Sequence, residues 1–250
     1  MLQLQFGVYA YITDTGLFAN APKEEEKDYE MLKSNFDNLF DNKIHKSSVS
    51  ASSGNTDYTT FVQEMYIKEA VGKHDIDAKV PVFNISSAVL DGENERIQGI
   101  YFNEILDIVR NAKSYTIYTI SYVAYINGNI LSLAIKCTLK DGSNPQKLRI
   151  ETINYDMKND KLLTLEDVIN VKGLKNQDVQ DKIDKEIQEV AAKKAEISEE
   201  GYNVYQRNPS DRMYKIENTR NFFLGDKGML YIVYPYGNKD YTNEKDIVIF

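Results

Sequence analysis

The chain has 250 residues, of which 42% are hydrophobic, 11% aromatic and 27% charged, and its formal net charge is −8. The length suits one large domain or two small ones, and the apolar fraction supports a sizeable core, so wholesale disorder is excluded. One cysteine excludes an intramolecular disulfide framework and any multi-cysteine metal site, and two histidines leave little for a histidine-based one. The acidic balance argues against a nucleic-acid-binding protein, which would present a basic face.

The N-terminal segment, residues 2–12, is uncharged and mostly apolar. It is shorter than the roughly 20 residues that span a membrane, and no basic region or small-residue cleavage site marks it as a signal peptide. Two interpretations remain open: an ordinary first strand or helix of the core, and the outer end of a spanning helix. The abrupt change at residues 14–16, followed by the charged residues 23–28, favours the second. We therefore expect residues 1–22 to be an apolar stub at the end of a membrane anchor.

Residues 23–57 are expected to hold an amphipathic helix and a linker. Apolar side chains recur at helical spacing over residues 24–41, with charged residues between them, which predicts one amphipathic helix. Residues 46–57 form a small-polar stretch rich in serine, which indicates a linker or a mobile loop.

Residues 58–165 are expected to form a first α+β subdomain. Period-two alternation predicts strands over residues 61–67, 75–82, 115–126, 129–139 and 147–157, and helical periodicity predicts a helix over residues 94–112. Asn127-Gly128 is a strong hairpin dipeptide, so we expect a tight turn with both of these residues at positive φ. Pro81 cannot donate a ladder hydrogen bond, which favours an edge strand or a strand end.

Residues 166–250 are expected to form a second α+β subdomain. Thr164 and Asp167 resemble a capping pair that opens a short helix. The periodicity predicts a long helix over residues 176–196 and strands over residues 229–234 and 246–250. Because helices alternate with hairpins rather than with single strands, the predicted fold class is α+β, with mainly antiparallel sheets packed against two long helices and an additional N-terminal amphipathic helix.

Few residues suit catalysis. Cys137 lies in register with the apolar face of its strand, which indicates a buried structural thiol. His45 and His74 fall in polar surroundings, and both are expected to be exposed and without a role. The sequence contains no glycine-rich phosphate loop, no nucleophile elbow and no H-E-x-x-H motif. We therefore predict a protein that is not an enzyme and that uses no cofactor.

Two groups of acidic residues have simpler explanations than a metal or catalytic site. Asp75 and Asp77 could suggest calcium, but alternation places both on one solvated strand face, and the glycine and distal glutamate of an EF-hand are missing. The second group surrounds a turn and a helix start, where carboxylates stabilise the helix dipole. It comprises Asp156, Asp160, Glu166 and Asp167. No metal site is predicted.

The C-terminal segment after strand 229–234 allows two interpretations. In the first, Tyr231 and Val233 pack in the core, and the Pro-Tyr-Gly corner that follows is only a turn. In the second, the segment forms an aromatic recognition rim, because tyrosine offers a large rigid apolar face with one polar group. The candidate binding residues of that rim are Tyr234, Tyr236, Asn238 and Tyr241.

The stretch over residues 122–169 resembles the paired extracytoplasmic domains of the RsiV and PdaC type, which are domain-of-unknown-function family 3298 preceded by its 4163-type companion. The most specific motifs are Ser132 after Ile130-Leu131, the run Thr152-Ile153-Asn154-Tyr155-Asp156, and the helix entry at residues 162–167. The predicted helix 176–196 and the strand that ends in Pro235-Tyr236 resemble the second half of these domains. The resemblance covers about residues 73–250 and departs from the family after Tyr236.

The resemblance implies an α+β domain outside the cytoplasmic membrane of a Gram-positive type bacterium, reached through one N-terminal span. In the RsiV branch such a region binds lysozyme, and in PdaC it accompanies a separate peptidoglycan deacetylase domain. We expect a membrane-anchored binding or sensing domain that faces the extracellular side. Its expected partner is a basic protein such as lysozyme, which the net charge would attract, or a cell-wall component. The alternatives are a structural cell-envelope domain and an accessory domain of a peptidoglycan-modifying enzyme.

Overall fold

The computed structural model describes residues 23–47, 57–238 and 242–250. The chain divides into two compact units, Met1–Leu39 and Phe40–Phe250. In the first unit, helix α1 spans Lys23–Ser34 and the short 3-10 helix η1 spans Phe36–Leu39. The predicted apolar stub, residues 1–22, lies outside the described residues, as does most of the predicted serine-rich linker. No helix in the described part of the chain combines the length and the hydropathy of a membrane span.

The single helix predicted over residues 24–41 is broken after Ser34. The Ser34 hydroxyl donates to the carbonyl oxygen of Met31 at 2.7 Å, and such local side-chain bonds compete with continuation of a helix. The next turn is tighter, because the amide of Asn38 donates to the carbonyl of Asn35 at 2.9 Å in the 3-10 pattern.

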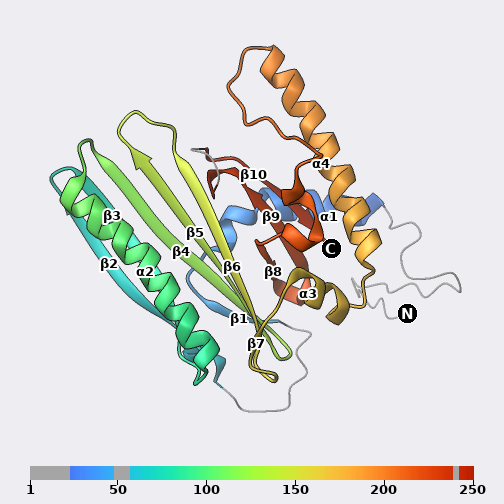
Figure 1. Ribbon diagram of the computed structural model, residues 1–250, viewed down its shortest axis with the longest axis horizontal. Coiled ribbons are helices and arrows are strands. Elements are labelled where there is room, and N and C mark those ends of the chain that lie inside the picture. The colour runs from blue at the N-terminus through green and yellow to red at the C-terminus, as the bar shows by residue number, and fades with distance from the viewer. Residues whose placement is uncertain (1–22, 48–56, 239–241) are drawn as a thin grey trace, which may run out of the picture. The chain divides into compact units, whose positions relative to one another are not determined.

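The second unit contains a seven-stranded sheet with the order β2-β3-β4-β5-β6-β7, in which β1 pairs with β4 off this path. Its strands are β1 (Ile44–Lys46), β2 (Val62–Val71), β3 (His74–Phe83), β4 (Thr116–Asn127), β5 (Ile130–Asp141), β6 (Lys147–Asp156) and β7 (Lys161–Leu162). Neighbouring strands are antiparallel except β3 with β4 and β1 with β4. Helix α2 (Ala88–Asn111) connects β3 to β4 and lies along one face of the sheet (Figure 1).

A second, three-stranded antiparallel sheet has the order β10-β9-β8. Its strands are β8 (Phe222–Leu224), β9 (Leu230–Pro235) and β10 (Lys245–Ile249), and the helices of this region are α3 (Leu165–Val171) and α4 (Asn176–Glu199). Among its described residues the unit also contains five short 3-10 helices: η2 (Tyr58–Thr60), η3 (Arg212–Tyr214), η4 (Ile216–Asn218), η5 (Asp226–Gly228) and η6 (Tyr236–Asn238). Helix α4 packs against β10.

Two hydrophobic cores follow from the alternation of side chains along the strands. The first lies between α2 and the large sheet and includes Tyr101, Tyr118 and Leu133. The second joins α3, α4 and the small sheet and includes Ile183 and Ile232. The predicted α+β class, with mainly antiparallel sheets and two long helices, is confirmed. The predicted subdomain boundary near residue 165 stays a prediction.

The hairpin between β4 and β5 is found where the sequence predicted it, but its turn differs in detail. Asn127 pairs with Ile130, so the two loop residues are Gly128 and Asn129. Among the residues of this turn only Gly128 has positive φ, at 61°. A two-residue turn with glycine first requires the left-handed conformation at that position alone, and glycine adopts it without a steric penalty. Asn127 is thereby left at the end of the ladder, with its side chain free for another contact.

The open edge of β8 is bonded to side chains of the large sheet. The backbone groups of Asn221 and Gly225 bond toward β9, so those of Phe222 and Leu224 point away from it, as alternation along an antiparallel strand requires. The amide of Phe222 donates to Thr152 Oγ1 at 2.9 Å. Asn154 Nδ2 donates to the carbonyl of Phe222 at 2.6 Å.

The same row of bonds continues along β8 to its end. The amide of Leu224 donates to Ser132 Oγ at 3.2 Å, and that hydroxyl donates to Asn154 Oδ1 at 2.7 Å. Asn127 Nδ2 lies 3.2 Å from the carbonyl oxygens of both Leu224 and Gly225. We call this row of side-chain bonds, made by Asn127, Ser132, Thr152 and Asn154, the seam. It joins the two sheets and satisfies an edge that would otherwise stay open.

Replacing Ser132 by alanine tests the seam. Ser132 is fully buried, and S132A leaves the amide of Leu224 and the Oδ1 atom of Asn154 without their partner. We expect the free energy of unfolding to fall by about 1–3 kcal/mol. Urea unfolding followed by circular dichroism measures it. The exposed turn residue Ser143 supplies the control, since S143A should change stability by less than about 0.5 kcal/mol. Equal changes in the free energy of unfolding for S132A and S143A would contradict the stabilising role of the seam.

Candidate functional site

A groove of about 700 Å³ lies beside the outer edge of β6. It is lined by Arg96, Arg149, Glu151, Thr152, Met213, Asn218, Arg220, Asn221, Val233, Tyr234, Pro235 and Asn238. A smaller hollow of about 180 Å³ adjoins it, because both share Arg96, Thr152 and Arg220. We call the two together the edge groove. Its volume falls within the range of about 300–1,000 Å³ that is common for ligand sites.

The backbone of β6 forms one side of the edge groove, and most of its outward groups are bonded. Asn238 closes the edge at one end, where its side-chain amide accepts from the amide of Ile150 at 3.0 Å and donates to the carbonyl of Ile150 at 2.8 Å. At the other end the amide of Leu163 donates to the carbonyl of Asn154 at 2.8 Å. Backbone groups alternate in direction along an antiparallel strand, so the N–H and C=O of Thr152 point outward as well. They lie between the bonds that Asn238 makes to Ile150 and the bond that Leu163 makes to Asn154. Neither group has a hydrogen-bond partner among the described residues.

Three arginines from different elements line the edge groove. Arg96 on α2 bonds Glu93 at 2.8 Å and Glu151 at 3.1 Å, so its charge is compensated. Arg149 on β6 is paired with a glutamate on α2, described below. Arg220, which precedes β8, is exposed, and its guanidinium has no ion pair or hydrogen bond within the described ranges. The groove therefore offers positive charge in a protein whose net charge is −8.

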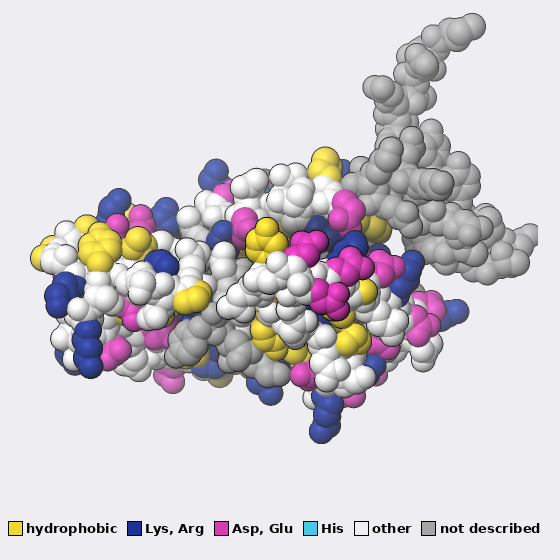
Figure 2. Space-filling view, turned by 90° about the horizontal axis from the view of Figure 1, so that it is seen from above, with side chains coloured by type: hydrophobic (Ala, Val, Ile, Leu, Met, Phe, Trp, Pro, Cys, Tyr) yellow, Lys and Arg dark blue, Asp and Glu magenta, His cyan; other side chains and the backbone are white. Residues whose placement is uncertain are grey.

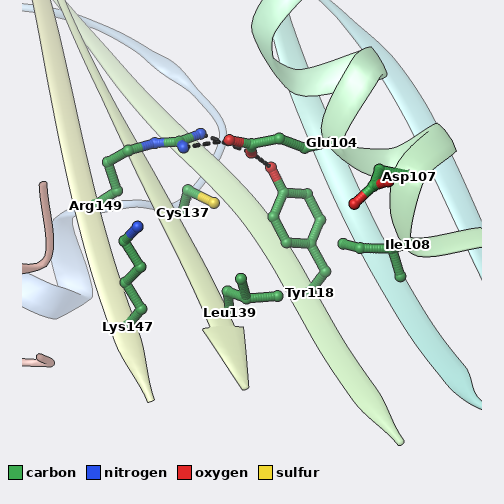
Figure 3. Close-up of a pocket in the computed structure, with 8 residues that line it drawn as sticks. All are labelled: Glu104, Asp107, Ile108, Tyr118, Cys137, Leu139, Lys147 and Arg149. Carbon is green, nitrogen blue, oxygen red and sulfur yellow. Dashed lines mark hydrogen bonds and ion pairs between the residues drawn. The ribbon is translucent and has the colours of Figure 1, made fainter. Parts of the chain in front are cut away.

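Arg149 is held by a cluster between β6 and α2. Its guanidinium bonds both carboxylate oxygens of Glu104, at 2.5 and 2.8 Å, and the Tyr118 hydroxyl donates to the same carboxylate (Figure 3). Burial acts to raise the pKa of Glu104, but hydrogen bonds from Arg149 and Tyr118 outweigh burial and hold the pKa below its usual 4.5. A bidentate arginine–carboxylate pair fixes both partners in one geometry, so the position of Arg149 is set before any ligand arrives.

Cys137 lies in a small pocket of about 130 Å³ beside this cluster, together with Lys147 and Leu139 (Figure 3). The thiol is 3% exposed, and burial raises its pKa to about 11. A thiol in this state is protonated at neutral pH and is a poor nucleophile. The predicted burial of Cys137 is confirmed.

Two buried donors beside the edge groove lack acceptors. Asn218 Nδ2 and Arg149 Nε have no hydrogen-bond partner within the described part of the chain. Glu151 Oε1 lies 3.7 Å from Arg149 Nε, which is beyond hydrogen-bonding distance. Buried polar groups are seldom left unpaired, so these two require an explanation. Because neither atom is accessible to solvent, the donors that the groove itself offers are the Thr152 amide and the Arg220 guanidinium.

Two of the four residues of the predicted aromatic recognition rim are buried, and the binding role of the rim stays a prediction. Tyr236 is fully buried, and Tyr234 is 3% exposed, with only that small part available to the edge groove. The Tyr236 hydroxyl bonds Tyr214 at 2.9 Å and also donates to the Asp246 carboxylate. These residues belong to the second core, which is the first of the two interpretations considered for this segment. Tyr241 lies outside the described residues.

A buried arginine explains why Tyr236 turns inward. Arg207 is 7% exposed and bonds both carboxylate oxygens of Asp246, at 3.0 and 2.9 Å. Its guanidinium lies 4.5 Å from the centroid of the Tyr236 ring, and the Tyr205 ring stacks on that ring at 4.2 Å. A buried charge must be paired, and an aromatic face beside it adds a favourable contact. Sequence periodicity cannot show this network, because Arg207 lies in a segment without regular structure.

Asn238 and Tyr234 line the edge groove, so the predicted site and the groove meet at these two residues. Asn238 is exposed, but both polar atoms of its side chain bond the backbone of Ile150. Gly237 allows this segment to lie close enough to β6 for those bonds to form. A Cβ atom at Gly237 would lie 1.7 Å from the carbonyl oxygen of Leu148. The Pro-Tyr-Gly corner is therefore a close contact between two backbones.

The remaining candidate residues have structural roles in the described part of the chain. His74 is 8% exposed and lies 3.1 Å from Glu69 Oε1, so its predicted exposure is wrong. His45 is half-buried and bonds Asp41 at 3.0 Å. Asp77 lies 3.7 Å from Lys68. No group of three His, Cys, Asp or Glu side chains within the described ranges could hold a metal ion.

The acidic group around residue 160 caps local structure. Asp156 accepts hydrogen bonds from the amides of Lys158 and Asn159 at 2.9 and 3.1 Å. Thr164 and Asp167 form the predicted capping box, since each side chain bonds the backbone of the other. The arginines of the edge groove, in contrast, belong to no motif, and their convergence is visible only once α2, β6 and β8 are assembled.

Comparisons with known proteins do not establish a family for the chain. No family model matches it, and no curated protein matches it. The solved structures that are similar to it in fold include two of the DUF3298 family. A DUF3298 family protein from Pseudomonas aeruginosa is 14% identical, with 75% of this chain and 88% of that chain covered and a TM-score of 0.43. A DUF3298 family member from Bacteroides fragilis is 13% identical, with 76% and 89% covered and a TM-score of 0.40. At these values neither one identifies the site or the function.

Replacing Gly237 by alanine tests the close approach at the corner. The added Cβ would meet backbone of Leu148 rather than a flexible side chain, so η6 or β6 must move. We expect G237A to lower the free energy of unfolding by more than about 2 kcal/mol. Gly99, inside α2, has nothing within 4 Å of an added Cβ. G99A should therefore keep or raise stability, by up to about 1 kcal/mol. If urea unfolding shows that G237A lowers the free energy of unfolding only slightly, the close contact between Gly237 and Leu148 is contradicted.

Replacing Glu104 by glutamine tests the Arg149 cluster through its pH dependence. The folded state lowers the pKa of Glu104, so its contribution to stability is present above the unfolded pKa and is lost as the pH falls below about 4.5. We expect E104Q to be less stable than the wild type at pH 7, with a smaller difference at pH 3.5. Urea midpoints at both pH values measure this. E95Q, at an exposed position of the same helix, should match the wild type at both.

Proposed function

We propose that this chain is an extracytoplasmic binding or sensing domain, of the type found in RsiV and beside the catalytic domain of PdaC, and that the edge groove is its ligand site. The observation that carries the proposal is the groove itself, a hollow of about 700 Å³ bordered by positive charge and by the unpaired backbone of Thr152. The resemblance in the sequence motifs supports the domain type.

The motif residues support a shared architecture rather than a shared ligand. Ser132, Thr152 and Asn154, which carry the resemblance, are the side chains of the seam. A sequence that must join two sheets in this way needs hydroxyl and amide groups at these positions. The ligand is set elsewhere, by residues such as Arg220 that belong to no motif.

Most groups that line the edge groove suit binding better than catalysis, and its two carboxylates, Glu93 and Glu151, are both paired with Arg96. We therefore propose a protein that is not an enzyme. Arginine remains charged at physiological pH and does not exchange protons, and asparagine and threonine only form hydrogen bonds. The thiol of Cys137 faces the separate small pocket and is protonated. Such groups can orient and hold a ligand.

The proposed location is the outer side of a cell membrane, and residues 2–12 are proposed to be the end of the anchor. The proposed partner is a basic protein such as lysozyme, attracted by the negative charge of the chain as a whole, or a cell-wall component. The positive edge groove would contact an acidic group of that partner. Figure 2 shows basic and acidic side chains interspersed over much of one face, with one group of acidic side chains gathered toward the right of the view. Together with the net charge of −8, such groups favour approach of a basic protein.

Titration calorimetry of the full chain tests this proposal. We expect heat of binding with lysozyme or with soluble peptidoglycan fragments at about 10 mM salt, where the Debye length is about 30 Å. Binding to lysozyme should weaken at least tenfold at about 0.5 M salt because the attraction is then screened. Succinylated lysozyme, in which acidic groups replace the lysine charges, is the control and should not bind. Absence of heat with both lysozyme and the fragments at low salt would contradict the proposal.

A further inference from the structure

We propose that the edge groove binds an extended peptide that carries a carboxylate, with the peptide backbone paired to Thr152 and the carboxylate bound by Arg220. The inference rests on the proposed binding function and names the ligand class of its site.

The open backbone of Thr152 requires a partner with both a donor and an acceptor. Its N–H and C=O face the same way, between the closures that Asn238 and β7 make on the edge of β6. A peptide that lies along this edge can supply one C=O and one N–H at the spacing of a strand, as in β-strand addition. A fully ionised phosphate group could only accept and would leave the Thr152 carbonyl unpaired.

The length of open edge limits how much of the peptide can pair. The edge is closed at Ile150 by the Asn238 side chain and at Asn154 by Leu163. Only the backbone groups of Thr152 stay available, so the peptide makes one pair of backbone bonds here. The rest of its affinity must come from side chains in the groove.

The positive charge of Arg220 favours an acidic side chain on the part of the peptide that pairs with Thr152. The Arg220 carbonyl oxygen accepts from Thr152 Oγ1 at 3.3 Å, which places Arg220 directly beside the open edge. Arg96 is already compensated by Glu93 and Glu151, and Arg149 by Glu104. The guanidinium of Arg220 is left to bind a ligand, and a carboxylate fits its planar pair of donors.

The experiment compares two peptides that differ in one charge. The probe is the acetylated and amidated pentapeptide Thr-Val-Glu-Val-Thr, and its control carries glutamine in place of glutamate. We expect calorimetry on the full chain at about 20 mM salt to show at least fivefold tighter binding of the glutamate peptide. R220Q should remove this preference. R110Q, which removes the same charge from an exposed position on α2 outside the groove, should retain it.

A second measurement reports on the backbone pairing. Hydrogen exchange of the Thr152 amide should slow at least fivefold when the glutamate peptide is bound, because that amide gains a partner. Exchange that is unchanged, an R220Q variant that keeps the preference, or equal binding of the two peptides would each overturn the inference. Inorganic phosphate that binds as tightly as the peptide would also overturn it and would leave a simple anion site.

The outcomes separate this inference from the proposed function. A chain that binds lysozyme or peptidoglycan fragments but neither peptide keeps its proposed function and loses the peptide site. A chain that binds the glutamate peptide through Arg220, but neither lysozyme nor the fragments, keeps the peptide site and loses the proposed partners. Thermal unfolding of R220Q and R110Q should match the wild type, since both arginines are exposed.

Discussion

The seam between the two sheets is the interaction on which the rest of the structure depends. Strand β8 forms hydrogen bonds with β9 on one side only, and its other side would be an open edge in the interior of the protein. Thr152, Asn154, Ser132 and Asn127 bond those backbone groups with their side chains. Because an unpaired buried backbone group costs about as much as a lost hydrogen bond, each of these four residues stabilises the packing of the small sheet there.

The edge groove is a consequence of that arrangement. The seam draws β8 against the face of β5 and β6, so the segment before β8 passes close to the outer edge of β6. The corner at Gly237 brings a second segment to the same edge, and Asn238 occupies the place that a neighbouring strand would take. The space left between the two segments holds Thr152 and Arg220. The hollow exists because the small sheet contacts the large sheet through the edge strand β8 rather than through its whole face.

Features that depend on a few neighbouring residues were predicted correctly, whereas the burial of side chains that depends on tertiary contacts was not. The β4–β5 hairpin, the capping box of Thr164 and the burial of Cys137 are each decided by a few neighbouring residues, and each is confirmed. His74, Tyr234 and Tyr236 were placed at the surface by one interpretation of their neighbours in sequence. Tyr234 and Tyr236 are buried with partners from other segments: Thr219 bonds the Tyr234 hydroxyl, and Asp246 and Arg207 contact Tyr236. The buried His74 bonds Glu69 on the neighbouring strand of its own hairpin.

The sequence by itself determined the α+β class, most of the order of helices and strands and the scarcity of cysteine and histidine, because periodicity, turn residues and composition act over short distances. Only the tertiary structure decided where ligand-binding groups converge. Arg96, Arg149 and Arg220 are separated by 53 and 71 positions in the chain, and nothing in their local sequence relates them. Their meeting depends on the packing of α2 and on the seam, which are interactions between segments far apart in sequence.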